Sequence, residues 1–197
     1  MLNDESASIK IPQGPFMFGF HLTNMNVQEI GGVITDPASL YPDRARLLVT
    51  PNIMDVVLLS EHPDFRRAYD TADIITPDGF PVLKYARLLG YPLNQRITGH
   101  DIFSAIMDHM HDRDWSLFIV TNNQETVNGF REFWGGQGLS QDRLFFHIPP
   151  FFFENDADYC RNLATEIRES KAKILVMGLG PPKSAVFVYE HLRELPG

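Results

Sequence analysis

The sequence predicts an α/β protein of Rossmann-like architecture, with a mostly parallel sheet that carries helices on both faces. From about residue 46 onward, short apolar runs alternate with longer segments of helical periodicity. Polar turns rich in Pro, Asn, Asp and Gly separate each run from the helical segment after it. This repeated strand–turn–helix order is typical of parallel sheets covered by helices.

The expected elements follow from these patterns. Buried strands are expected at residues 45–50, 73–76, 115–121, 143–148 and 172–178. Helices are expected at residues 53–69, with a bend or break at Pro63, and at 80–90, closed by Gly90. Further helices are expected at residues 100–113, 122–136, 156–170 and 184–195. We expect an N-terminal tail at residues 1–20 and a single domain at residues 21–197.

Composition restricts the class of protein. The chain has 197 residues, of which 44% are hydrophobic and 21% charged, as in ordinary globular domains. A net charge of −8 argues against nonspecific nucleic-acid binding. The single cysteine, Cys160, excludes an internal disulfide and fits a reducing compartment. With no long apolar run and no signal-peptide pattern, we expect a cytoplasmic protein that could still contact the inner face of a membrane.

Four polar turns follow expected strands, at residues 50–52, 77–79, 121–123 and 178–183. In open parallel sheets, ligands bind outside the carboxyl ends of the strands. These turns are therefore expected to line one polar cleft.

Asp78 is the candidate catalytic residue in this cleft. Pro77 fixes the backbone before it, and Gly79 permits an unusual turn after it. A carboxylate held in this way could accept a proton from a substrate hydroxyl. The alternative is that Asp78 caps the following helix, a position that favours Asp.

The segment GLGPPKS, which begins at Gly178, favours an anion site. Its glycines would let backbone N–H groups approach a diphosphate, and Lys183 would add a positive charge. The segment lacks the third glycine of the dinucleotide fingerprint and the spacing of a P-loop. A tight strand-to-helix connection with a solvated Lys183 explains it equally well.

Other polar residues have a structural alternative as well. Arg96 could bind a phosphate with two hydrogen bonds, whereas Thr98 or Asp101 is expected to cap the helix near residue 100. Thr50 and Asn52 could contact a sugar or begin the next helix. No metal site is expected, because His109 and His111 do not share a helix face.

In order and spacing, four segments resemble the WecG/TagA/CpsF glycosyltransferase family. They are VTPN, HPDFRRAYDTADIITPDGFPVLKYARLLG, QRITGHDIF and ILVMGLGPPK, and the resemblance runs from about Thr50 to Leu195. It implies an inverting, metal-independent transfer of an N-acetylmannosamine-like sugar from a UDP-sugar, without a cofactor. The implied acceptor is a sugar linked to a polyprenyl diphosphate, used in surface polysaccharide or teichoic acid synthesis. Family members also often self-associate.

The resemblance also implies roles for individual residues. Asp78 matches the general base of the family, and Thr50 is expected to be a second catalytic residue. The substrate-binding positions are Asn52, Gly79, Arg96, Thr98, Gly178, Gly180 and Lys183. Ser184-Ala185 departs from the family pattern of Gln-Glu, and the chain ends at Gly197 where the family usually continues with a glycine-rich strand and a basic tail. The alternative is therefore a noncatalytic protein of the same descent that binds a nucleotide sugar or a protein partner. A Rossmann oxidoreductase is disfavoured, because no GxGxxG motif follows the first strand.

Overall fold

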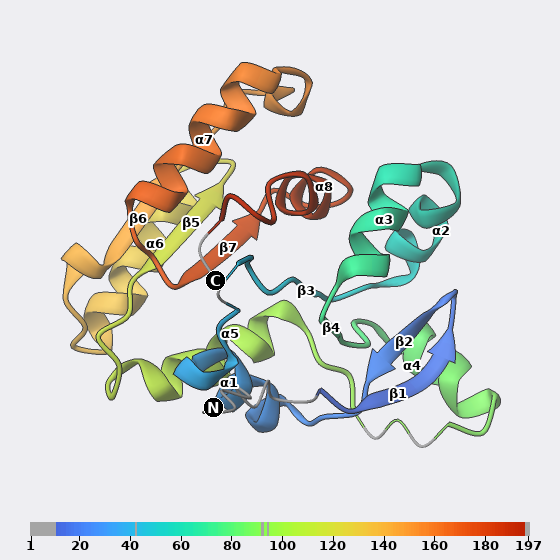
Figure 1. The fold of residues 1–197 in the computed structure, drawn as a ribbon. Coiled ribbons are helices and arrows are strands. Elements are labelled where there is room, and N and C mark those ends of the chain that lie inside the picture. Colours follow the sequence, from blue (N-terminus) through green and yellow to red (C-terminus); the bar gives the residue numbers. More distant parts are fainter. Residues whose placement is uncertain (1–10, 42, 92, 94, 196–197) are drawn as a thin grey trace, which may run out of the picture.

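The computed structural model describes residues 11–41, 43–91, 93 and 95–195 (Figure 1). The strands in this part of the chain are β1 (Gln13–Met17), β2 (Phe20–Thr23), β3 (Leu48–Val49), β4 (Ile74–Ile75), β5 (Leu117–Thr121), β6 (Leu144–His147) and β7 (Ile174–Gly178). The α-helices are α1 (Val27–Thr35), α2 (Ile53–Glu61), α3 (Pro63–Thr71), α4 (Phe80–Leu88), α5 (Gly99–Met110), α6 (Gln124–Gly136), α7 (Ala157–Glu169) and α8 (Lys183–Glu190). No helix among the described residues is long and apolar enough to cross a bilayer.

The strands from β3 onward pair in parallel, as the sequence predicted. β5 lies between β6 and β7 in a three-stranded sheet, and β3 pairs with β4 in a separate two-stranded sheet. β1 and β2 form an antiparallel hairpin. β1 begins at Gln13, within the segment expected to be a tail, while residues 1–10 of that segment lie outside the described residues.

Helices cover both faces of the parallel sheet, which confirms the predicted fold class. Successive side chains of β5 point to opposite faces. Leu117 and Ile119 join one core cluster and Phe118 and Val120 the other. The first cluster includes buried residues of α1, α5 and α6, and the second includes buried residues of α3, α7 and α8. β5 is fully buried because helices pack on it from both sides.

The helix boundaries reflect local signals in the sequence. The segment predicted as one helix at 53–69 breaks where Pro63 was expected to break it, so α2 ends at Glu61 and α3 begins at Pro63. Gly90 has φ of +81° just after α4, a conformation that glycine adopts without strain. α1 was not predicted, although Asn26 and Glu29 form a capping box at its start.

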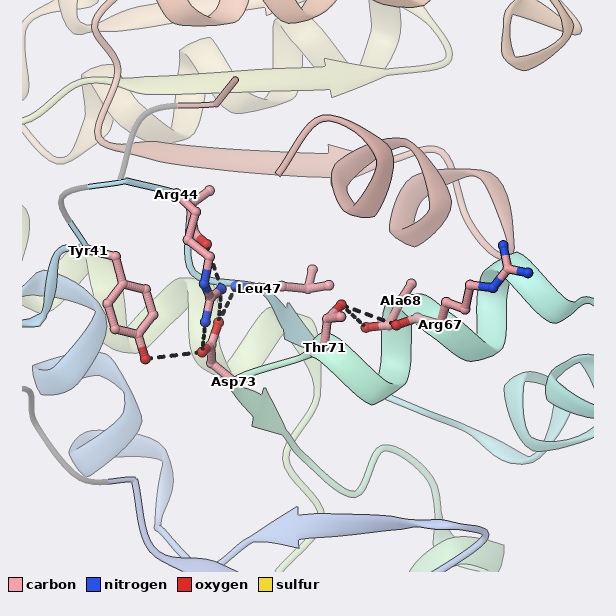
Figure 2. A network of polar contacts seen from close by, with 8 residues as sticks. Tyr41, Arg44, Leu47, Arg67, Ala68, Thr71 and Asp73 are labelled. Atoms are coloured by element: carbon pink, nitrogen blue, oxygen red, sulfur yellow. Dashed lines mark hydrogen bonds and ion pairs between the residues drawn. The ribbon is translucent and has the colours of Figure 1, made fainter. Parts of the chain in front are cut away.

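A polar network fixes the starts of β3 and β4 (Figure 2). The Asp73 carboxylate accepts hydrogen bonds from Arg44 at 2.6 and 2.9 Å, from the backbone N–H of Leu47 at 2.9 Å, and from the Tyr41 hydroxyl at 3.2 Å. The Asp73 side chain is 8% exposed, so these bonds compensate for the loss of hydration. The network holds the two strands in register and so positions the turns that follow them.

Candidate active site

Three turns meet at the carboxyl ends of β3 and β4. The backbone N–H of Asp78 donates to Pro51 O at 3.0 Å, which joins the turn after β4 to the turn after β3. Ile97 N donates to Pro77 O at 3.0 Å, and the buried Thr76 hydroxyl donates to Ile97 O at 3.1 Å. The segment that precedes α5 is thereby tied to the same edge of the sheet.

Two glycines lie beside the polar side chains of the turn after β3. Gly79 has φ of +106°, and a Cβ atom at this position would lie 3.8 Å from the Asn52 Cβ. A Cβ atom at Gly99 would lie 4.0 Å from the Thr50 Oγ1. These are ordinary van der Waals distances, so a Cβ atom would fit at either position, and Gly79 is needed for its backbone conformation.

A cavity of about 450 Å³ opens at this edge and continues between β3 and β7. Its wall at the carboxyl ends of the strands includes Thr50, Asn52, Asp55, Asp78, Gly99, Gly180, Pro181 and Ser184. Of the nine predicted site residues, the cavity therefore gathers Thr50, Asn52, Asp78 and Gly180. The cavity is built from the turns after β3, β4 and β7 and from the start of α5. The turn at residues 121–123 after β5, which was also expected to line the cleft, is not part of the cavity wall.

Asp78 is held at the cavity without a structural partner. The cap of α4 is Gly79, with no side-chain capping bond, so Asp78 does not fill the capping role that was the alternative for it. Its carboxylate makes no hydrogen bond or ion pair within the described part of the chain. Burial raises the pKa of Asp78, Arg96 opposes this by lowering it, and Asp101 raises it further. The carboxylate is therefore free and more basic than an ordinary aspartate.

A second carboxylate, Asp55, lies in the same cavity and was missed from the sequence. It is 5% exposed and accepts a hydrogen bond from Asn52 N at 2.8 Å. Burial raises the pKa of Asp55, the Asn52 hydrogen bond lowers it, and the charge of Asp78 raises it again. The spacing Asn52-x-x-Asp55 was the available signal, because it is a capping-box pattern at the start of a helix.

Two predicted site residues cap helices. The Asn52 side chain accepts hydrogen bonds from Met54 N at 2.7 Å and Asp55 N at 3.4 Å, and it also lines the cavity. Thr98 caps α5, accepting from Asp101 N at 3.1 Å and donating to the Asp101 carboxylate at 2.7 Å. The Thr98 backbone N–H also donates to the Asp101 carboxylate, at 2.8 Å, and this bond together with the one from the Thr98 hydroxyl holds the pKa of Asp101 below its usual value. Thr98 is not part of the cavity wall, so of these two residues only Asn52 both caps a helix and lines the cavity.

The remaining predicted residues lie around the cavity rather than on its wall. Arg96 is exposed and stacks 5.4 Å from the centre of the Phe80 ring, on the segment that follows Asp78. Gly178 ends β7, where a Cβ atom would lie 3.3 Å from Val120 O, so close packing explains this glycine. Lys183 is the first residue of α8, which has no side-chain cap.

The arrangement combines a free base with groups that favour an anion. Gly180, with φ of +80°, leads into the uncapped first turn of α8, whose N–H groups favour negative charge. Arg96 supplies a positive charge near Asp78. Among the described residues, no group of three or more His, Cys, Asp or Glu side chains is arranged to hold a metal ion. A proton acceptor and an anion-stabilising turn at one cavity suit a group transfer with an anionic leaving group.

A cavity with polar residues at the carboxyl ends of parallel strands is typical of a ligand-binding α/β protein. Residues 16–197 match the model of the glycosyl transferase WecG/TagA/CpsF family, and the chain belongs to this family. It is similar to an N-acetylglucosaminyldiphosphoundecaprenol N-acetyl-beta-D-mannosaminyltransferase from Bacillus spizizenii, with 23% identity over 154 residues. The match covers 78% of this chain and 58% of that relative, so the chain spans less than two thirds of the relative's length.

Proposed function

We propose that this protein transfers a sugar of the N-acetylmannosamine type from a UDP-sugar to an acceptor sugar linked to a polyprenyl diphosphate. The observation that carries the proposal is the free Asp78 carboxylate on the wall of the cavity that the Gly180 turn also lines. The name of the Bacillus spizizenii relative supports the choice of substrates, since it describes mannosaminyl transfer to a diphosphoundecaprenol-linked N-acetylglucosamine. Family membership supports the class of reaction.

In the proposed reaction, Asp78 acts as the general base. The acceptor hydroxyl oxygen attacks the anomeric carbon of the donor sugar while the bond from that carbon to the UDP oxygen breaks. Asp78 takes the hydroxyl proton, and UDP leaves with the bonding electrons on the opposite side, so the anomeric centre is inverted. A pKa raised by burial makes Asp78 a better proton acceptor than an ordinary aspartate, provided that it is ionised at the working pH.

The leaving diphosphate needs stabilisation as its negative charge develops. In this proposal, the N–H groups at the start of α8 and the Gly180 turn face the diphosphate, and Arg96 and Lys183 add positive charge around it. Thr50 and Asn52 hydrogen-bond the donor sugar. These protein groups would support the reaction without a metal ion.

A transfer assay tests this function. The chain is incubated with UDP-N-acetylmannosamine and a polyprenyl-diphosphate-linked N-acetylglucosamine, once with magnesium and once with EDTA. Equal formation of an inverted disaccharide product in both reactions is expected. Donor binding measured by calorimetry without any transfer would instead favour the noncatalytic binding protein, and transfer that requires magnesium would contradict the metal-independent reaction.

A further inference from the structure

The outer face of α4 exposes large apolar side chains beside the candidate active site. Phe80 is 63% exposed, Leu88 82% and Leu89 50%, whereas Val82 and Ala86 on the opposite face are fully buried. A helix that covers the core normally presents polar residues to solvent. α4 instead presents apolar groups on its outer face, and exposed apolar patches of this kind indicate an interaction surface.

Aromatic contacts extend this surface on both sides of the helix. Tyr85, 45% exposed, stacks on Phe18 of the β1–β2 turn with 5.3 Å between ring centres. Phe80 lies under the Arg96 guanidinium, at the end of α4 nearest to Asp78. Figure 1 shows α4 beside the β1–β2 hairpin. We call the exposed side chains of Phe80, Lys84, Tyr85, Leu88 and Leu89 the α4 face.

The charge of this segment is opposite to that of the protein. Residues 79–100 contain no acidic residue and three basic ones, Lys84, Arg87 and Arg96. The rest of the chain therefore carries all 25 acidic residues against 14 basic ones. A positively charged apolar face on an acidic protein is complementary to an anionic surface that is also apolar beneath its charges.

We propose that the α4 face docks on an anionic lipid bilayer surface. Leu88, Leu89 and Phe80 enter the boundary between head groups and acyl chains, while Lys84 meets the lipid phosphates. Basic residues without any acidic one in this segment favour this occupant over a protein partner, because the centres of protein interfaces are depleted in charged residues and in lysine. A lipid surface needs no shape complementarity, which suits a convex helix face.

Docking in this orientation places the cavity next to the membrane. Asp78 and Gly79 directly precede the first residue of α4, so the candidate base lies at the edge of the docked surface. This consequence rests on the proposed function, since an acceptor on a polyprenyl chain stays in the bilayer. Binding to the bilayer itself requires neither the donor nor the reaction.

Co-sedimentation with vesicles tests the proposal. The chain is mixed with vesicles of phosphatidylcholine or of an equal mixture with phosphatidylglycerol, at low and high salt. We expect binding to the anionic vesicles that weakens with salt. The double variant Leu88→Glu/Leu89→Glu removes apolar contacts and adds negative charge at exposed positions, so we expect at least a tenfold loss of vesicle affinity.

Phe151→Glu is the matched control, because Phe151 is 90% exposed and lies on the loop after β6. It should bind vesicles like the unmodified chain. The proposal is overturned if the unmodified chain does not bind, if the control loses as much affinity as the double variant, or if the double variant binds normally. It is also overturned if the double variant instead abolishes self-association in solution, since the face would then belong to a second copy.

Calorimetric titration with UDP separates this proposal from the proposed function. The double variant should keep the UDP affinity of the unmodified chain, because neither leucine lines the cavity. Loss of vesicle binding with UDP binding retained assigns the α4 face to the membrane. Vesicle binding by a chain that performs no transfer would leave the docking surface established and contradict only the reaction.

Discussion

Replacing Asn52 with alanine separates its structural role from its role in the candidate site. Its side-chain oxygen accepts hydrogen bonds from Met54 N at 2.7 Å and from Asp55 N at 3.4 Å, which caps α2. Its Nδ2 group makes no hydrogen bond within the described residues and is available to a ligand in the cavity. The same variant should therefore lower both stability and donor affinity.

The size of each effect follows from these contacts. Loss of an Asn N-cap costs about 0.5–2 kcal/mol. Because one of the two bonds is short and the other long, we expect a loss of about 1 kcal/mol in the free energy of unfolding. For a domain of this length, that loss lowers Tm by about 2–4 °C. Loss of one hydrogen bond to the donor weakens its binding by about two- to tenfold.

Asn123→Ala is the control, because Asn123 is likewise the N-cap of a helix, α6, and is not part of the cavity wall. Its side chain accepts a hydrogen bond from Thr126 N at 2.8 Å. Thermal unfolding followed by circular dichroism should show similar losses of Tm for both variants. Calorimetric titration with UDP-N-acetylmannosamine should show weaker binding only for Asn52→Ala. Equal donor affinity in the two variants would refute a binding role for Asn52, and an unchanged Tm for Asn52→Ala would refute the cap.

Three further predictions concern the turn, the strand starts and pH. Gly79→Ala should lower the free energy of unfolding by about 1–3 kcal/mol in urea denaturation, because φ of +106° strains any residue with a Cβ atom. Arg44→Ala removes the charged partner of Asp73 (Figure 2) and should lower the free energy of unfolding by about 2 kcal/mol, as measured by thermal unfolding. This loss is smaller than for a fully buried ion pair, because the Arg44 side chain is 27% exposed. The rate of transfer should fall as pH drops through the pKa of Asp78, which lies above the ordinary value of 3.8. Because Arg96 lowers that pKa, Arg96→Gln should move the fall to higher pH in a pH–rate profile.

The parallel part of the fold could be predicted because its signals are local. Each apolar run from β3 to β7 is short, continuous and bounded by turn residues, which distinguishes a buried strand from a helix. Pro63 and Gly90 mark helix boundaries through their own backbone restrictions. The carboxyl-edge rule then placed Thr50, Asn52, Asp78 and Gly180 at one cavity.

The features that were missed depend on contacts between distant segments. α1 packs on α5, where Gly31 approaches Ala105 so closely that a Cβ atom would lie 2.8 Å from its side chain. The burial of Asp55 likewise depends on the cavity around it rather than on its neighbours in sequence. Thr98 and Asn52 are both capping residues by type, and only the structure shows that one of them also faces the cavity.

The most direct test of the central claim compares transfer and binding in Asp78→Asn. Asparagine keeps the shape of the side chain but cannot accept the proton, so UDP affinity measured by calorimetry should be retained while transfer falls by about 10²–10⁴-fold. Asp112→Asn, at an exposed position after α5, should leave both quantities unchanged. Transfer by Asp78→Asn at the rate of the unmodified chain would contradict the assignment of Asp78 as the base.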